Sequence, residues 1–205
     1  MKLYYVPGAC SLSPHIALRE AGLNFALVKV TPASGAHKLD KTADGTDFLD
    51  INPIGVVPVL ELEDGTTLTE GPAIVQYIAD QAPEAVLAPP NGTLQRAQMQ
   101  SWLNFISTEL HKGMAPLFNP ATPADYKPML IDKLYSRLGF VNQQLDGQSY
   151  MMGDTFSVAD PYLFVVTNWV ENMKLNITQF PNIVSFRNRM AARPAVQAAL
   201  SAEKG

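Results

Sequence analysis

The stretch Val56-Val57-Pro58-Val59-Leu60-Glu61-Leu62-Glu63-Asp64-Gly65-Thr66-Thr67-Leu68-Thr69 decides the fold of the first part of this chain. Apolar and polar residues alternate up to the turn at 63–66, and such alternation is typical of a strand. Asp-Gly between two such runs is a hairpin signal. Residues 71–81 follow with apolar side chains at helical spacing. The stretch therefore predicts two strands of a hairpin and a helix that closes the segment.

The residues before this hairpin predict a strand, a helix and a second strand. Leu3–Val6 is a short apolar run that ends at a Pro-Gly pair, which is typical of a buried strand followed by a loop. Ser13 fits an N-cap and Pro14 the first helical position, so a helix is expected over 14–21. Residues 25–30 predict the next strand, and the polar residues 31–45 predict a long mobile connection.

The residues after the hairpin predict helices only. Proline and turn residues concentrate in 82–92, where they would interrupt a helix. Apolar residues recur at three and four positions over 131–145, which indicates an amphipathic helix. Ser157 and Asp160 form a capping pattern for a further helix, and Pro181 and Pro194 punctuate two last helices. We therefore expect a first domain over 1–81, a linker over 82–93 and an all-helical domain over 94–205.

The composition excludes several classes of function. Fifteen Lys and Arg residues against 19 Asp and Glu give the 205-residue chain a net charge of -4, with no basic run for a nucleic-acid backbone. The single cysteine cannot form an internal disulfide, which favours the reducing cytoplasm. No apolar window is long enough for a membrane span. Three scattered histidines and one cysteine give no metal-ligand spacing, so no metal is expected.

Cys10 lies in the loop between the first strand and the first predicted helix. Free N–H groups and partial positive charge at a helix N-terminus stabilise a thiolate, and the hydroxyl of Ser11 is a possible second donor. A free cysteine is also often a small buried apolar side chain. From the residues alone, both interpretations stay open.

Pro58 and Glu70 are two further candidates in the same half of the chain. A cis bond before Pro58 would leave the backbone N–H and C=O of Val57 available to an extended peptide, although trans is far more common. Glu70 and Gly71 open the closing helix, where a carboxylate could hold a ligand ammonium and the helix N–H groups a ligand carboxylate. Glu70 could equally balance the helix dipole.

Asn104, Thr108 and His111 share one face of the helix expected over 94–113, since they are spaced by four and three residues. This polar face lies among large apolar neighbours. It could line a cleft or a subunit boundary, or it could simply face solvent.

Taken together, these motifs resemble the cytosolic glutathione transferases, and within them the bacterial beta class. The resemblance spans essentially the whole chain. In the first half it rests on Lys2-Leu3-Tyr4-Tyr5, on Pro7-Gly8-Ala9-Cys10-Ser11-Leu12-Ser13, on Asn52-Pro53-x-Gly55-x-Val57-Pro58 and on Leu68-Thr69-Glu70-Gly71. In the second half it rests on Trp102-Leu103-Asn104-Phe105, on Glu109-Leu110-His111-Lys112-Gly113 and on Gly153-Asp154-x-Phe156-Ser157-x-Ala159-Asp160.

The resemblance implies a thioredoxin-like N-terminal domain, an all-helical C-terminal domain and a homodimer, with glutathione as co-substrate. It implies that Pro58 is cis and that Val57 pairs with the cysteinyl backbone of glutathione. Glu70 and Gly71 would bind its γ-glutamyl end, and Cys10 would face its sulfur.

The same resemblance places glutathione and cleft contacts in the helical half. Asn104 would reach the ligand from the partner subunit. Thr108, Glu109, Leu110 and His111 would line the active cleft, with His111 near Cys10.

Two features depart from the family pattern. Ile54 replaces the lysine that is common between Asn-Pro and Gly. The connection over 31–45 is longer than usual, so the lysine that commonly contacts glutathione could match Lys38, Lys41 or neither.

The leading hypothesis is that glutathione binds as a thiolate and attacks an electrophilic carbon of a small apolar acceptor. Cys10 and the first helix N-terminus would stabilise the sulfur anion, with Ser11 or His111 as a second donor. One alternative is thiol exchange, in which Cys10 forms a mixed disulfide with glutathione. Another is a non-catalytic carrier of apolar ligands.

Overall fold

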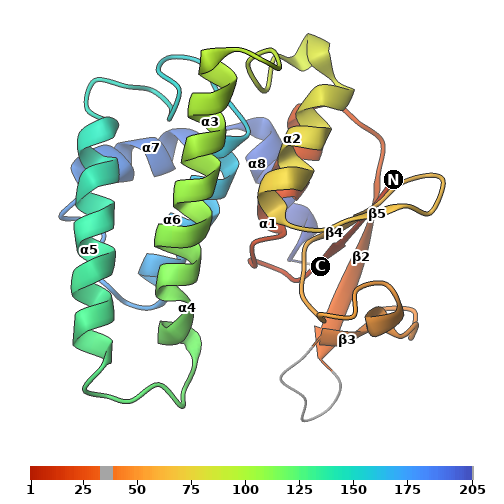
Figure 1. Cartoon of the computed structure of the whole chain (residues 1–205), viewed down its shortest axis with the longest axis horizontal. Coiled ribbons are helices and arrows are strands. Elements are labelled where there is room, and N and C mark those ends of the chain that lie inside the picture. The colour runs from red at the N-terminus through yellow and green to blue at the C-terminus, as the bar shows by residue number, and fades with distance from the viewer. Residues whose placement is uncertain (33–38, 205) are drawn as a thin grey trace. The chain divides into compact units, whose positions relative to one another are not determined.

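The computed structural model describes residues 1–32 and 39–204. Two compact units make up the chain: the first comprises Met1–Ala88 and Ala192–Gly205, the second Pro89–Ala191 (Figure 1). The sequence-based boundaries ran from 1 to 81 and from 94 to 205. The final helix, assigned there to the helical half, packs in the structure with the first unit.

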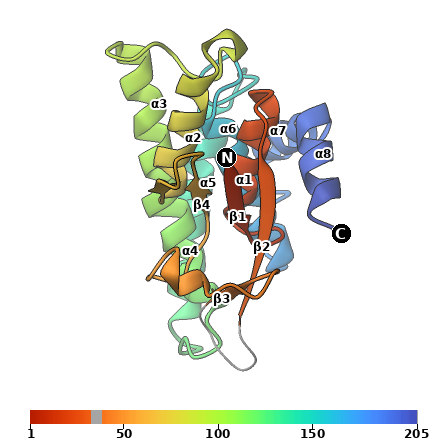
Figure 2. The ribbon, with the colours of Figure 1, turned by 90° about the vertical axis from the view of Figure 1, so that its right-hand side faces the viewer.

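A five-stranded sheet forms the centre of the first unit. Its strands are β1 (Lys2–Tyr5), β2 (Ala26–Pro32), β3 (Leu39–Thr42), β4 (Val59–Glu61) and β5 (Thr67–Leu68), in the order β3-β2-β1-β4-β5 (Figure 2). β1 and β2 are parallel, whereas the other neighbouring pairs are antiparallel. Together with its helices, this is the thioredoxin-like arrangement that the resemblance implies.

The helices of this unit are α1 (Leu12–Glu20), α2 (Gly71–Gln81) and α8 (Pro194–Ala202), with 3₁₀ turns η1 (Phe48–Asp50) and η2 (Pro83–Ala85). Both α2 and α8 pack against α1. Tyr4 of β1 lies on the opposite face of its strand from Leu3 and Tyr5, because side chains alternate along a strand. Tyr4 packs against Phe48, with ring centroids 5.7 Å apart. The sheet is therefore covered on both faces.

The structure corrects two expectations for this unit. The long connection predicted over 31–45 contains the end of β2 and all of β3, while residues 33–38 lie outside the described part. The first helix begins at Leu12, not at Pro14. The hydroxyl of Ser13, the expected N-cap, is buried without a hydrogen-bond partner in the described structure, so it caps nothing.

The second unit is helical, as predicted. It contains α3 (Leu94–Phe105), a π-helical turn η3 (Ile106–His111), α4 (Lys112–Phe118), α5 (Lys127–Gln144), α6 (Ala159–Asn172) and α7 (Pro181–Ala191). The capping pattern before α6 is confirmed, since the Asp160 carboxylate accepts from the N–H of Ser157 at 2.7 Å and from its hydroxyl at 3.1 Å. Among the described residues, no helix has the length and apolar character needed to cross a membrane.

Candidate active site

Cys10 lies at the start of α1, closer to the helix than the sequence indicated. The N–H of Ser13 donates to the carbonyl of Cys10 at 3.1 Å, so the backbone already turns into the helix there. The thiol forms no disulfide and is half-buried. The N–H groups of the first helical turn carry partial positive charge, so a negative charge beside them would be stabilised. Because Cys10 is partly exposed, it is not the small buried apolar side chain that was the other interpretation of this residue.

The thiol of Cys10 contacts the residue before the predicted cis-proline. Cys10 Sγ donates to the carbonyl oxygen of Val57 at 3.2 Å. The bond between Val57 and Pro58 is cis, as the resemblance implies. Two candidates separated by 47 positions in the sequence are thus brought into direct contact by the fold.

Glu70 and Gly71 continue this site on the other side of Pro58. A Cβ built on Gly71 would lie 3.8 Å from Cγ of Pro58, which places the start of α2 against the proline ring. Glu70 precedes α2 with φ of 64°, an uncommon conformation for a residue with a side chain. Its exposed carboxylate makes no capping hydrogen bond. Glu70 occupies the N-cap position of α2, where its charge can balance the helix dipole without a hydrogen bond, so this geometry is compatible with both interpretations of the residue. Backbone outliers of this kind cluster at ligand sites.

Ser11 is fully buried, and its hydroxyl bonds to one residue of its own loop. Ser11 Oγ accepts from the N–H of Val6 at 3.1 Å and donates to the carbonyl of Val6 at 3.2 Å. The side chain in this conformation closes the loop between β1 and α1. It does not point a donor at a ligand sulfur, which was its expected role.

Of the five candidates in the second unit, two have exposed side chains and two have side chains that are engaged within the unit. Asn104 and Thr108 are exposed, and the Thr108 hydroxyl donates to the carbonyl of Asn104 at 3.0 Å. Leu110 is fully buried, so its side chain belongs to the core of this unit. Glu109 accepts from Nε of Arg137 at 2.7 Å, and this contact lowers the pKa of its carboxyl. The side chains of Leu110 and Glu109 are thus already engaged within the unit.

His111, the fifth candidate, ends the π-helical turn and lies in an aromatic cluster. Its Nδ1 shares a hydrogen bond of 2.8 Å with the hydroxyl of Tyr162. Its ring centroid lies 4.8 Å from that of Trp169, which in turn contacts Phe118 at 5.8 Å. π-helical turns are rare and frequently occur at functional sites. Tyr162 was predicted only as part of an apolar helix, although a phenol on such a face is a signal for a buried polar partner.

We expect His111 to be neutral at pH 7. Burial, with a smaller contribution from the charge of Lys112, lowers its pKa to about 4. An unfolded chain binds a proton at this residue below about pH 6.5, whereas the folded chain does not until about pH 4. The stability contributed by this difference is present above pH 6.5 and is lost as the pH falls towards 4.

NMR titration of the His111 ring measures this pKa directly. In parallel, the pH dependence of the free energy of unfolding should be flatter in His111→Gln than in the native protein between about pH 6.5 and 4. His15 is present in both proteins, so the difference between their two pH profiles of unfolding free energy reports on His111. A ring that titrates near 6.5 would contradict the expectation.

The lysine candidates are only partly covered by the structure. Lys41 is an exposed residue of β3, and Lys38 lies outside the described residues. Ile54, which replaces the common lysine, is 66% exposed. Among the described residues, Lys41 and Ile54 have no hydrogen bond to the Cys10 loop.

The sequences of both halves of the chain match models of known protein families. A sequence model described as the glutathione S-transferase N-terminal domain matches residues 8–81, and one described as the C-terminal domain matches residues 105–194. The chain belongs to the glutathione S-transferase family. The resemblance drawn from the motifs is therefore confirmed.

Individual members of the family are similar over their full length. Glutathione S-transferase GstA of Escherichia coli O157:H7 is 47% identical over 203 residues, which is 99% of this chain and 98% of the relative. A sphingomonad glutathione S-transferase solved with glutathione is 45% identical, with a TM-score of 0.94 over 100% of this chain and 99% of that one. A beta-class glutathione S-transferase of Sphingomonas chungbukensis is 46% identical, with a TM-score of 0.92 over 99% and 98%.

Proposed function

We propose that this family member is a beta-class glutathione transferase that joins glutathione to small electrophilic apolar acceptors. One observation carries the proposal: the Cys10 thiol lies at the start of α1 and 3.2 Å from the carbonyl of Val57, beside the cis-proline. A ligand sulfur placed against Cys10 would share the positive end of that helix. The glutathione complex of the sphingomonad relative supports the choice of thiol.

The proposed reaction needs a stabilised sulfur anion. Glutathione loses its thiol proton to solvent or base, and its thiolate then forms a bond to the electrophilic carbon while the leaving group departs with its electron pair. Each unit by which the site lowers the thiol pKa corresponds to about 1.4 kcal/mol. The N–H groups at the start of α1 would supply this stabilisation, and Val57 would pair with the ligand backbone. The Cys10 S–H, which donates to the Val57 carbonyl in the structure, would turn to the ligand sulfur when glutathione binds.

Thiol exchange is the second candidate, since Cys10 is a partly exposed cysteine that forms no disulfide and lies next to a helix N-terminus. Its thiolate would attack a disulfide sulfur and form a mixed disulfide, and the other sulfur would leave as a thiolate. A non-catalytic carrier would instead bind apolar ligands without glutathione.

Calorimetric titration with glutathione, followed by a screen of aryl halides, epoxides and hydroperoxides, tests all three functions. Conjugates with aryl halides or epoxides support the transferase. Reduction of hydroperoxides without conjugates supports thiol exchange. If apolar compounds bind without turnover and glutathione does not bind, the protein is a carrier.

Glu70→Gln is expected to weaken glutathione binding about tenfold or more. The substitution keeps the shape of the side chain but removes the charge that would pair with the ligand ammonium, and hydrogen bonds to charged groups contribute about 1.5 to 3 kcal/mol. Calorimetry measures the change in Kd. Glu63→Gln is the matched control, because Glu63 is an exposed acid in the turn of the same hairpin. Equal Kd values for the two variants would show that Glu70 does not bind glutathione.

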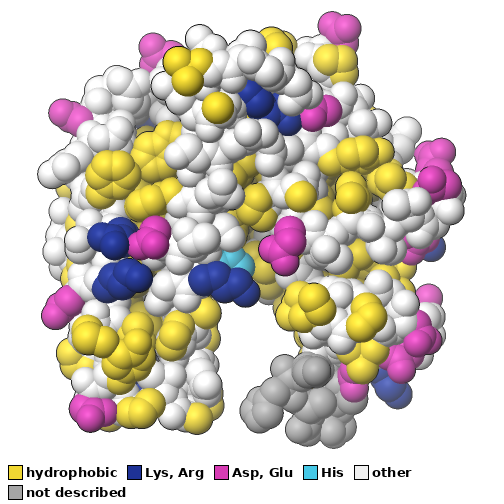
Figure 3. Space-filling model, viewed as in Figure 1, with side chains coloured by type: hydrophobic (Ala, Val, Ile, Leu, Met, Phe, Trp, Pro, Cys, Tyr) yellow, Lys and Arg dark blue, Asp and Glu magenta, His cyan; other side chains and the backbone are white. Residues whose placement is uncertain are grey.

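We also propose that the protein forms a homodimer. Apolar side chains reach the surface of both units on the face shown in Figure 3, with basic and acidic side chains interspersed. In the second unit, Trp102, Phe105 and Phe140 form a cluster with ring centroids 5.4 to 5.8 Å apart, and Phe140 is 42% exposed. An exposed aromatic cluster of this kind is typical of a protein contact. Light scattering measures the mass in solution.

The remaining proposals rest on the family resemblance. They are the glutathione contacts of Asn104, Thr108 and His111 and the location in the cytoplasm. Cys10 forms no disulfide, which is compatible with a reducing compartment.

A further inference from the structure

His111 is held at its Nδ1 atom by Tyr162, a residue of another helix. The Tyr162 hydroxyl lies 2.8 Å from Nδ1, and the planes of the two rings meet at 82°. Tyr162 is 4% exposed, whereas His111 is half-buried. Nε2 of His111 has no hydrogen bond among the described residues, and it is not one of their fully buried atoms without a partner. This second ring nitrogen is therefore open to solvent.

The backbone of two helices brings the His111 ring into this position. In the π-helical turn η3, the N–H of Lys112 bonds to the carbonyl of Ser107, five residues earlier. This wider turn changes the direction in which His111 points relative to α3. On α6, Tyr162 and Trp169 are seven residues apart and share one face of the helix. Their ring centroids lie 5.9 and 4.8 Å from that of His111, so the imidazole has little freedom to turn.

The chemistry of the two groups decides which of them donates the hydrogen bond. An imidazole nitrogen binds a proton with a pKa of about 6.5, whereas tyrosine loses its proton only at a pKa of about 10. The ring nitrogen is a much stronger base than the oxygen of a neutral phenol, so the favoured bond runs from the Tyr162 hydroxyl to Nδ1. Burial keeps His111 neutral at pH 7, and a neutral ring carries one hydrogen. That hydrogen lies on Nε2.

We propose that Tyr162 is a positioning residue for His111: its hydroxyl occupies Nδ1 and thereby fixes the ring as an Nε2–H donor. Because the ring is neutral, such a donor binds an anionic atom without adding a charge to the site. Without the hydroxyl, the hydrogen can move to Nδ1, and Nε2 would then present a lone pair that repels the anion. Under the proposed function the anion is the glutathione sulfur, and only this consequence rests on that function.

The nitrogen resonances of His111 test the assignment without glutathione. Long-range ¹H–¹⁵N correlation at pH 7 distinguishes a protonated ring nitrogen from a bare one, and the spectrum of His111→Gln identifies the residue among the three histidines. We expect a protonated Nε2 and a bare Nδ1. Tyr162→Phe keeps the aromatic ring and removes the hydroxyl. Its averaged Nε2 resonance should move towards the value of a bare nitrogen, because the hydrogen then exchanges between both atoms.

Tyr135→Phe serves as the matched control. Tyr135 lies on α5 of the same unit, and its hydroxyl accepts from the N–H of Asn176 at 3.0 Å. The control also removes one hydrogen bond of a phenol, but its partner is not His111. We expect the nitrogen resonances of His111 to keep their native positions.

Kinetics then shows whether Tyr162 acts through His111. In a functional transferase, Tyr162→Phe should lower kcat/KM for conjugation about threefold, since part of the rings lose the Nε2–H donor. The same substitution should have no effect in the His111→Gln background, because the residue through which it acts is already absent.

Three results would overturn the positioning role. The first is a native ring with its hydrogen on Nδ1, and the native spectrum alone decides this point. The second is an Nε2 resonance that does not move in Tyr162→Phe, or that moves equally in Tyr135→Phe. The third is an equal loss of kcat/KM with and without His111. A shifted Nε2 resonance in a protein that does not bind glutathione would support the positioning role and reject the proposed function.

Discussion

Cys10→Ser is expected to abolish thiol exchange and to leave conjugation within about tenfold of the native rate. The variant has no thiol, so no mixed disulfide with glutathione can form. The serine hydroxyl can still donate a hydrogen bond to a bound thiolate, and the N-terminus of α1 is unchanged. Mass spectrometry after incubation with glutathione disulfide measures the adduct, and an aryl halide assay measures conjugation.

The two activities of this variant separate the candidate mechanisms. Retained conjugation with no exchange would show that Cys10 is not essential to conjugation. Loss of both activities would contradict simple stabilisation of the glutathione thiolate. Ser11→Ala is a useful companion variant, because the Ser11 hydroxyl is hydrogen-bonded to the backbone of Val6. Its removal should change the conformation of the loop and should not remove a hydrogen bond to the reacting sulfur.

Asp160→Ala is expected to lower the free energy of unfolding by about 3 kcal/mol or more, since each buried group left unsatisfied costs about 1 to 3 kcal/mol. The fully buried carboxylate accepts from the N–H of Met151 at 2.8 Å and from the N–H and hydroxyl of Ser157. Alanine would leave these donors without their acceptor and would remove the cap of α6. Urea unfolding measures the loss.

Asp154→Ala provides the control for this prediction. Asp154 is exposed and accepts from the hydroxyl of Ser149 at 3.1 Å, so its loss should cost no more than about 0.5 kcal/mol. A loss below about 1 kcal/mol in Asp160→Ala would mean that the donors find other partners when the carboxylate is gone.

Short sequence signals predicted the helices and strands whose first or last residues are compatible with only one position of the boundary. Asp64-Gly65 identified the hairpin, and Pro181 and Pro194 indicated two separate helices, which begin in the structure at these prolines. Ser157 with Asp160 identified the start of α6. In each case the residue at the boundary has the backbone preference that this position of the helix or turn requires.

The start of α1 could not be predicted, because two serines offer competing caps. Pro14 is compatible with the first helical position, and this placed the cap at Ser13. It is equally compatible with the third position, which also lacks an intrahelical acceptor for its N–H. Contact of Ser11 with Val6 decides between them, and that contact belongs to the folded loop.

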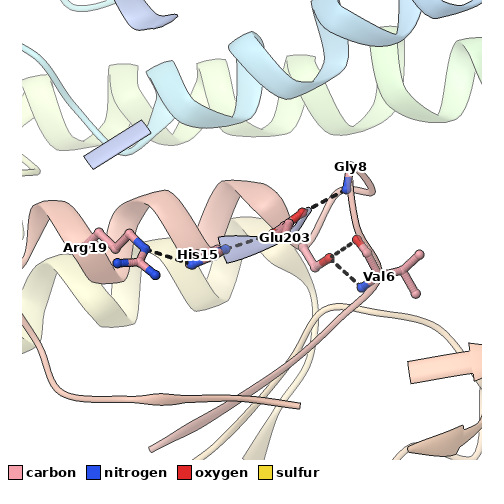
Figure 4. A network of polar contacts seen from close by, with 6 residues as sticks. Val6, Gly8, His15, Arg19 and Glu203 are labelled. Atoms are coloured by element: carbon pink, nitrogen blue, oxygen red, sulfur yellow. Dashed lines mark hydrogen bonds and ion pairs between the residues drawn. The ribbon is translucent and has the colours of Figure 1, made fainter. Parts of the chain in front are cut away.

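The sequence predicted which residues belong to the candidate site around Cys10, but it did not predict which of their atoms are in contact. Cys10, Val57, Pro58 and Gly71 were named from motifs, and the fold joins them. Glu203, whose buried carboxylate accepts from the N–H of Gly8 (Figure 4), had no signal, because an acid near the end of a helix is common on a solvated surface. Its burial depends on the packing of α8 against α1, which lies far away in the sequence.

That packing affects the order in which the chain can fold during synthesis. The first unit is discontinuous: Met1–Ala88 leaves the ribosome early, but its last helix follows only after residues 89–191 have been made. Until then the side of α1 that α8 covers stays open to water, and the Glu203 carboxylate, which accepts from the N–H of Gly8 at 2.8 Å, is missing. The loop of Cys10 thus reaches its final structure only after α8 has been made, so a chain that stops before α8 lacks the completed site.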